Sequence, residues 1–489
     1  MRRFPGTILS ASALALTLAL SGCGTGAATD APAAGTSAAP SSTGSGSDAA
    51  DGGSAAARDA FFADGVSHRI SVAWEESDYA DMVAAYEADG AKDWIQADIT
   101  IDGTVVPNVG VRLKGNSTLR SLSGGGARMA GNANTSNTME ISSDVPESLP
   151  LLIDFDKYTD GQTYQGLTQL ALRPGSPALN EALALALTAA SGQATQRFAY
   201  STYSVNGSPT QTRLLVENPD ETYADSLFGT AGVLYKADAE SSFRYQGDDL
   251  ATYEEQFKQL NAEGSEDVQP VVDFLKWLSE ASDEEFDAEL ADWVDIGSFA
   301  RYTATMNLLV NGDDMAGPGR NYYLWYDLES KKISVISWDL NLAMTGDAAA
   351  SPDDQLSIGG GGGAVPPGQN GDPGTPPGGS DPASDPAAAS AANEYGGGMA
   401  GRMAGGGGRG GNELKERFLA SEAFRPAYEA AYADLYDRMY GDGTATELLD
   451  EIASAVPSSD GVTAEDLAEQ AATLRTFIDE RTEALEDDV

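Results

Sequence analysis

Two aspartates and an asparagine lie in a polar stretch between apolar segments, and these side chains are well suited to chemistry. Asp313 and Asp314 follow an apolar run, and Asn321 begins a predicted strand. A second predicted strand, 333–338, ends immediately before Asp339. The two strands form a predicted hairpin, so its end would bring carboxylates and an amide together. Oxygen ligands of this kind suit Mg²⁺ or Mn²⁺ and do not suit zinc.

Several cations lie where a phosphate could be bound. Arg112 and Lys114 alternate on one face of a predicted strand and precede the turn 115–117, and Lys157 follows another strand. A cation beside the backbone amides of a glycine turn can bind phosphate, although alternating cations on a strand more often form a solvated face. Glu181 lies near the start of a predicted helix. It either holds one lysine in an ion pair or is a surface carboxylate.

Composition excludes many other kinds of chemistry. The chain has one cysteine, Cys23, and one histidine, His68, so Ser-His-Asp hydrolases, zinc peptidases and cysteine nucleophiles are implausible. We expect His68 to be a partly exposed strand residue. The formal net charge is −46 and the pI is about 4.1, which argues against nucleic-acid binding.

The first residues have the pattern of an export signal. Two arginines are followed by an apolar stretch, 8–20, that is short for a membrane span. The sequence 20–23 resembles the lipobox of bacterial lipoproteins, which implies cleavage before Cys23 and lipid on its sulfur. An ordinary secretory signal with a chance cysteine is the alternative. We therefore predict a signal peptide at 1–22, a disordered tether at 23–58, and an extracytoplasmic protein that contacts the cell membrane only through this lipid anchor.

Hydrophobic patterning predicts one α+β domain at 59–489, with a strand-rich N-terminal part and a helical C-terminal part. The residues 347–411 are mostly Gly, Pro, Ala and Asp, which predicts a disordered insertion within the domain. Strands are predicted at 66–74, 95–101, 104–111, 150–155, 167–173, 197–205, 212–217, 321–326 and 333–338, and helices at 78–89, 180–191, over much of 253–309, and from 413 onwards.

Seven segments in order resemble the CotH family, the spore-coat-protein-H-like atypical kinases. They are GVRLKGNST, LPLLIDFDKY, GLTQLALR before LNEALALAL, LLVENPD, GVLYK, NGDDMAGPGRNYYLWYD and ISWDLNLAM. The resemblance covers roughly 61–344 and, more loosely, the helical C-terminus. It implies a divergent protein-kinase-like fold that transfers the γ-phosphoryl group of ATP to protein serine or threonine with Mg²⁺ or Mn²⁺.

The resemblance also implies roles for individual residues. Asp313 matches the catalytic-loop aspartate, with Asp314 as the alternative register. Asn321 matches the metal-binding asparagine, and Asp339 matches the metal-binding aspartate of the kinase DFG motif. The remaining implied roles are phosphate contacts by Arg112, Lys114 and Lys157, and an ion pair between Glu181 and one of the lysines.

Three functional hypotheses follow from these observations. The first is a kinase acting on an unidentified protein substrate in the envelope or among secreted proteins. The second is a non-catalytic lipoprotein that uses the same scaffold for adhesion or envelope assembly. A carboxylate-based glycoside hydrolase ranks last, because Tyr322 and Tyr323 are expected in the core and do not line a sugar cleft. The insertion at 347–411 would lie where a kinase has its activation segment.

Overall fold

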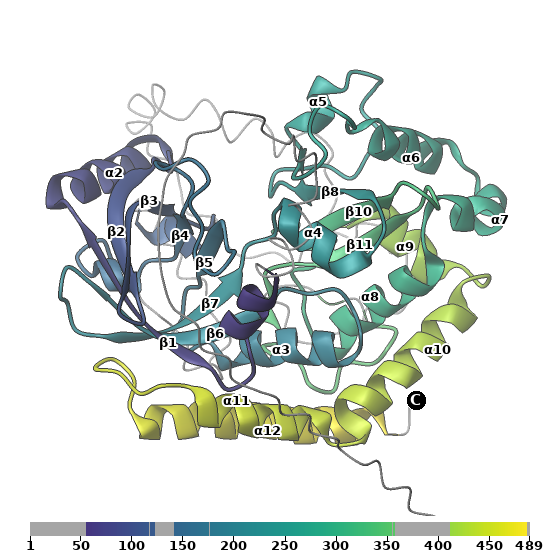
Figure 1. Ribbon diagram of the computed structural model, residues 1–489. Helices are drawn as coiled ribbons and strands as arrows, with labels where there is room; N and C mark the ends of the chain where they lie inside the picture. Colours follow the sequence, from purple (N-terminus) through teal and green to yellow (C-terminus); the bar gives the residue numbers. More distant parts are fainter. Residues whose placement is uncertain are drawn as a thin grey trace, which may run out of the picture. The chain divides into compact units, whose positions relative to one another are not determined.

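Seven strands of the N-terminal part close into a barrel in the order β1-β2-β3-β4-β5-β7-β6 (Figure 1). Strands β1 and β6 pair in parallel, and the other neighbours are antiparallel. Burial alternates along β1 because successive strand side chains point to opposite faces. The strands are β1 (Ser67–Trp74), β2 (Ile95–Ile101), β3 (Thr104–Leu113), β4 (Leu151–Asp154), β5 (Gln169–Leu172), β6 (Phe198–Val205) and β7 (Gln211–Glu217).

A second sheet of four strands has the order β11-β10-β8-β9. It contains β8 (Gly232–Ala237), β9 (Phe257–Gln259), β10 (Tyr322–Asp327) and β11 (Ile333–Ser337). The predicted hairpin is confirmed, since β10 pairs with β11 in antiparallel fashion. Its register sets Tyr322 opposite Ser337, which places Asn321 and Trp338 at the same end of the hairpin. Strand β9 is a short addition that was not predicted, inside the segment 253–309, which is mostly helical as expected.

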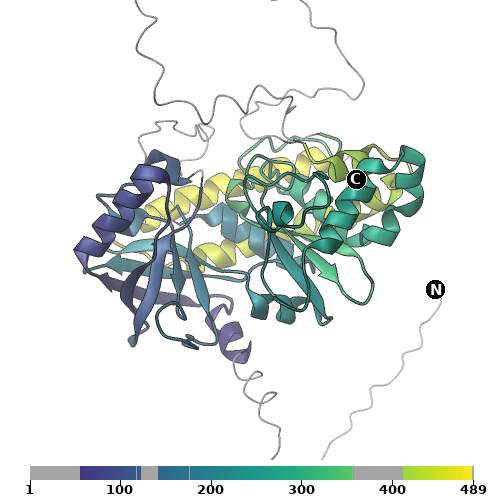
Figure 2. The same cartoon turned by 90° about the horizontal axis from the view of Figure 1, so that it is seen from above.

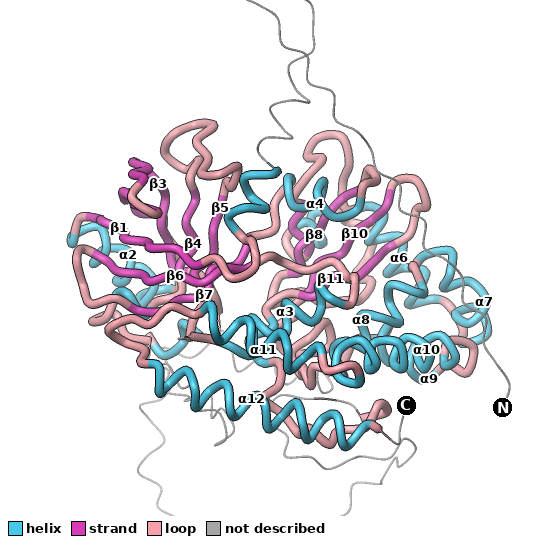
Figure 3. The backbone as a smooth tube through the Cα atoms, turned by 60° about the horizontal axis from the view of Figure 1, so that its bottom comes forward, coloured by secondary structure: helices cyan, strands magenta, loops and turns pink. Residues whose placement is uncertain are grey.

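Helix α3 (Leu179–Ala190) lies between β5 and β6 of the barrel along the chain and packs in the core that contains the second sheet. It is buried on nearly all sides, as its apolar sequence LNEALALALTAA requires. Figure 2 shows α2 (Glu76–Asp89) lying along the barrel. The remaining helices are α4 (Glu221–Phe228), α5 (Ala251–Glu254), α6 (Gln269–Glu280), α7 (Asp283–Trp293), α8 (Ile296–Leu308), α9 (Glu413–Ala420), α10 (Arg425–Tyr436), α11 (Thr444–Ala455) and α12 (Ala464–Leu485). Figure 3 shows α6, α7 and α8 on the side of the second sheet, and α11 and α12 running beneath α3 and the barrel.

Two hydrophobic cores hold these elements together. One fills the barrel, and the other lies among the second sheet, α3 and the C-terminal helices. Tyr322 and Tyr323 belong to the second core, as expected. Arg481 of α12 is fully buried in it and donates hydrogen bonds to backbone oxygens of Asn307 at 3.0 Å and Ala348 at 3.0 Å. The last long helix therefore fixes the end of α8 and the segment that follows the hairpin.

The computed structural model describes residues 55–116, 118–122, 141–175, 177–354, 356 and 411–486, which all belong to one compact unit. The predicted signal peptide 1–22, Cys23, the tether up to 54 and most of the insertion, including 357–410, lie outside the described residues. Among the helices described, none is both long and apolar enough to cross a membrane.

His68 differs from its expectation. It lies on β1 as predicted, but it is buried and not partly exposed. Its Nδ1 bonds Asp102 at 2.7 Å, its Nε2 bonds the backbone oxygen of Phe61 at 2.8 Å, and its ring stacks on that of Phe61. These contacts give His68 a structural role, because they hold β1 against Asp102 and Phe61.

Candidate functional site

Asp313 is held by the loop that connects α8 to β10. Its Oδ1 accepts a hydrogen bond from the Gly319 N–H at 2.7 Å, and its Oδ2 accepts one from Asn321 Nδ2 at 2.9 Å. The glycine is required here, because a Cβ on Gly319 would lie 2.5 Å from Asp313 Oδ2 and 2.7 Å from Asn321 Nδ2. The sequence GPGRN therefore wraps closely around one carboxylate and sets its direction.

Asp314 has a different environment. It is buried, its Oδ2 forms an ion pair with Lys415 of α9, and its Oδ1 accepts from the Ala316 N–H at 2.8 Å. This aspartate therefore fastens the loop to the C-terminal helices. Of the two neighbouring registers, the contacts favour Asp313 as the carboxylate available for chemistry, because it is Asp313 that contacts Asn321.

Asp339 follows β11 and belongs to a buried ionic network. It adopts a left-handed backbone conformation with φ 57° just before the 3₁₀ turn Leu340–Leu342. Its Oδ1 forms an ion pair with Arg173, whose Nε donates to Glu181 Oε1 at 2.8 Å. Arg173 comes directly after β5 and Glu181 lies in the first turn of α3. One guanidinium therefore bridges the barrel, the helix and the end of the hairpin.

Electrostatics in this network follow from burial and pairing. Burial lowers the pKa of Arg173, but Asp339 and Glu181 outweigh that effect and raise it overall. Burial raises the pKa of Glu181 to about 6, although Arg173 acts in the opposite direction. Arg173 thus remains a cation at all physiological pH values, and its charge is shared between two carboxylates.

Two lysines add to the positive charge beside Asp339. Lys114 Nζ lies 5.2 Å and Lys236 Nζ 5.3 Å from the centre of the Trp338 ring, and Lys114 Nζ also donates to Asn218 at 2.9 Å. Burial lowers the pKa of Lys236 to about 8, and burial with the nearby cations lowers the pKa of Lys114 well below its usual value. We call Lys114, Lys236 and Arg173 the cationic cluster. An anion that entered it would relieve the repulsion among its members.

The other predicted phosphate contacts lie elsewhere. Arg112 Cζ lies 4.8 Å and Lys157 Nζ lies 5.3 Å from the centre of the Trp94 ring. These two cations therefore lie beside Trp94, whereas Lys114 lies beside Trp338. The expected pairing of Glu181 with a lysine is wrong, since its partner is Arg173. Arg112 still influences the cationic cluster through space, because its charge lowers the pKa of Lys114.

The two carboxylates assigned to chemistry influence each other electrostatically. Burial is the main reason that the pKa of Asp313 is raised, the Gly319 N–H opposes the shift, and the charge of Asp339 adds to it. Asp313, Asn321 and Asp339 could supply two carboxylates and an amide oxygen to a cation. Among the described residues, no group of three or more acidic, histidine or cysteine side chains is arranged to hold a metal ion.

Sequence reasoning missed Arg173, Lys236 and Trp338 as site residues. Signals for two of them were present, because Arg173 ends the segment GLTQLALR a few residues before the helix with Glu181, and Lys236 ends GVLYK. Both segments look like ordinary buried strands, however, and only the meeting of β5, β8 and the hairpin end shows that their terminal cations converge.

A cationic cluster of one buried arginine and two partly buried lysines, beside two carboxylates and an amide, is the kind of site that handles phosphate groups. The family profile described as CotH kinase protein matches residues 111–485. This is more than half of the chain, so the chain belongs to that family, and the predicted resemblance is confirmed. Membership indicates a kinase-type function and the use of ATP and a metal ion. Comparison with curated proteins finds no match.

Proposed function

We propose that this chain is an atypical protein kinase that transfers the γ-phosphoryl group of ATP to serine or threonine of envelope or secreted proteins. The observation that carries the proposal is the bridge from Glu181 through Arg173 to Asp339. Protein kinases need a strand cation paired with a helix glutamate and an aspartate that follows a later strand. In this chain Arg173 would have the role that the strand lysine has in protein kinases.

The order of these parts along the chain supports a divergent protein-kinase-like fold. The cation directly follows strand β5, the glutamate lies on the next helix, and Asp313 and Asn321 precede the hairpin, which Asp339 follows. Kinases have their strand lysine, helix glutamate, catalytic aspartate, asparagine and final aspartate in the same order.

In the proposed step, the substrate hydroxyl oxygen attacks the γ-phosphorus while the bond to the bridging oxygen of ADP breaks. Asp313 accepts the hydroxyl proton, and its raised pKa makes it a better base than an ordinary exposed carboxylate. Gly319 and Asn321 hold that carboxylate in one orientation. The cationic cluster would bind the triphosphate and offset its charge.

Asn321 and Asp339 would hold the divalent metal ion. The donors fit Mg²⁺ or Mn²⁺, because such ions use one or two carboxylates together with substrate phosphates and water, and do not need a full protein cage. When bound, the ion would neutralise charge on the transferred phosphoryl group. Asn321 Nδ2 donates a hydrogen bond to Asp313, so the proposed metal ligand and the proposed base are in direct contact.

The test is Mg²⁺-dependent ATP binding and phosphorylation by the purified chain, measured by calorimetry and with γ-labelled ATP. Asp339→Asn should lose metal-dependent binding, and Asp313→Asn should keep binding but lose at least about a hundredfold in phosphorylation. Asp292→Ala, an exposed carboxylate on α7, is the control and should behave as the wild type. A wild-type chain that neither binds ATP nor labels any protein would support the non-catalytic alternative of adhesion or envelope assembly.

Location is part of the proposal. Lipid on Cys23 would hold the chain at the outer face of the cell membrane and place the kinase among envelope proteins. Expression of Cys23→Ala should move the chain from the membrane fraction to the soluble fraction and abolish incorporation of labelled fatty acid. Retention of the variant in the membrane fraction would contradict the anchor without bearing on catalysis.

A further inference from the structure

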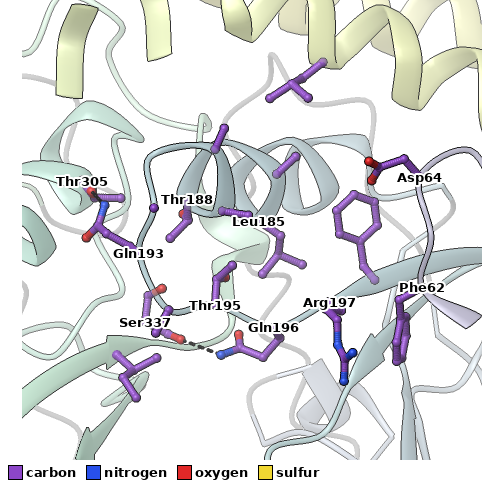
Figure 4. Close-up of a pocket in the computed structure, with 18 of the residues that line it drawn as sticks. Phe62, Asp64, Leu185, Thr188, Gln193, Thr195, Gln196, Arg197, Thr305 and Ser337 are labelled. Carbon is purple, nitrogen blue, oxygen red and sulfur yellow. Dashed lines mark hydrogen bonds between the residues drawn. The ribbon is translucent and has the colours of Figure 1, made fainter. Parts of the chain in front are cut away.

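A cavity of about 970 Å³ lies between α3, the start of β6, β11, α8 and α11 (Figure 4). None of Asp313, Asn321, Asp339 or the cationic cluster lines it. It is therefore separate from the candidate kinase site, although it uses the opposite end of α3 from Glu181. Its size falls in the range of cavities that bind small molecules.

The cavity has polar atoms without partners on an otherwise mostly apolar wall. Among the described residues, the buried atoms Thr195 Oγ1, Gln196 Oε1 and Ser337 Oγ have no hydrogen-bond partner. Their residues are only 8%, 2% and 3% exposed. The hydroxyl of Tyr200, another residue of the lining, also has no partner. Buried polar groups are almost always hydrogen-bonded, so four such atoms in residues that line one cavity indicate a missing partner.

The orientation of Gln196 is fixed by the fold. Its Nε2 donates to the backbone oxygen of Ser337 at 3.1 Å and to the Tyr223 hydroxyl at 3.1 Å. The amide oxygen is therefore an acceptor that the protein holds in place but does not use. Figure 4 shows Gln196 and Ser337 side by side, with Leu185 reaching from α3 toward Thr195 on the facing wall. A ligand between these walls would contact apolar and hydrogen-bonding groups together.

Charges at the cavity edge argue against an anionic ligand. Arg197 is already paired with Asp59 and Glu217, and Arg301 is paired with Asp434. Both guanidinium groups are thus neutralised by carboxylates. A nucleotide or phosphate would find no spare positive charge here, in contrast to the cationic cluster.

We propose that this cavity is a second ligand site, for a small, uncharged and largely apolar molecule that carries at least one hydrogen-bond donor. The donor would bond Gln196 Oε1, and the apolar body would lie against Leu185 and the apolar residues of α11. Thr195 and Ser337 hydroxyls could satisfy a further polar group of the ligand.

The probe for the test is N-phenyl-1-naphthylamine, an uncharged aromatic amine with one N–H donor whose fluorescence rises in apolar surroundings. The full chain should bind it saturably with one site. Ala186→Phe places a ring in the cavity from α3 and should weaken binding at least tenfold, as should Ala455→Phe from α11. Ala427→Phe, at a partly buried position of α10 outside the cavity, is the matched control and should bind as the wild type.

Thermal melting of each variant checks that the fold is retained. Two cavity variants are used so that the test can still be made if one of them does not fold. Weakened binding in a folded cavity variant, with the control unchanged, supports the site. The absence of saturable binding by the wild type, or equal binding by all four proteins, overturns it. Competition by ATP at the probe site would also overturn it, since that result would place the probe in the phosphate-binding region.

Discussion

Replacement of Arg173 by methionine tests the buried ionic network that joins the two sheets. The side chains of Arg173 and Glu181 are only 6% and 3% exposed, and Arg173 also pairs with Asp339. Methionine keeps much of the aliphatic volume but leaves Glu181 as a buried carboxylate without a counter-charge. Removal of one partner of a buried ion pair typically costs about 3–5 kcal/mol, and two charge-assisted hydrogen bonds at about 1.5–3 kcal/mol each give a similar sum.

Urea unfolding followed by tryptophan fluorescence measures this loss. With a slope of about 3 kcal/mol per molar urea, the midpoint should fall by about 1–2 M. The double variant R173M/E181Q removes the orphaned charge together with its partner and should recover most of that loss, because a neutral amide costs less to bury than a carboxylate. Both variants should lose ATP binding, since neither has the bridging cation.

The pH dependence gives an independent check of the same reasoning. The pKa of Glu181 is raised to about 6 in the folded protein, so protonation of this carboxyl stabilises the fold. Its contribution is fully present below the unfolded pKa and is lost as pH rises through about 6. Without Arg173 that pKa rises further, so R173M should be closer to the wild type at pH 5 than at pH 8. Two results would refute the assigned network. One is a urea midpoint of R173M/E181Q that is no higher than that of R173M, and the other is a midpoint loss in R173M that does not depend on pH.

Three further predictions concern the site and its support. If ATP binds the cationic cluster, affinity should fall up to about tenfold per pH unit above the Lys236 pKa of about 8, as the charge of Lys236 is lost. Calorimetry in buffers of different ionisation enthalpy should show proton uptake on binding, and Lys236→Arg should reduce that uptake without removing the part due to Lys114, whose pKa is also lowered. Gly319→Ala should displace Asp313 and reduce phosphorylation about a hundredfold, while the melting temperature stays within a few degrees of the wild type. The control Gly297→Ala, at the start of α8, should have full activity. Equal activity of the two variants would contradict the role of the GPGRN loop. Arg481→Met should lower the free energy of unfolding by about 3 kcal/mol, because carbonyl oxygens at the end of α8 and in the segment after the hairpin lose a charged donor. An unchanged urea midpoint would count against that role.

Local patterns in the sequence predicted most of the secondary structure that positions the site. Alternation of polar and apolar residues identified β1, short apolar runs identified the buried hairpin β10–β11, and a helix-forming apolar run identified α3, because these features depend on neighbours within a few residues. The family could also be predicted, since an ordered series of segments is preserved along the chain and does not require contacts to be known.

The same patterns could not give the second sheet in full. Strand β9 has three residues, too few for a period to be recognised, and its formation depends on β8, which lies some twenty residues earlier in the chain. Burial of His68 likewise depends on Asp102 and on Phe61, which close over it only when the barrel forms.

For the candidate site, residue types alone determined that oxygen ligands and cations were the available chemistry, because the chain has one cysteine and one histidine. Tertiary structure decided which cations meet the carboxylates. Arg112 and Lys114 are two residues apart on the chain, yet they flank different indoles, Trp94 and Trp338. Arg173 and Asp339, in contrast, are far apart in sequence and form one ion pair. Charge interactions act through space, so the partner of a buried charge is set by how β5, α3 and the hairpin pack and not by its place along the chain.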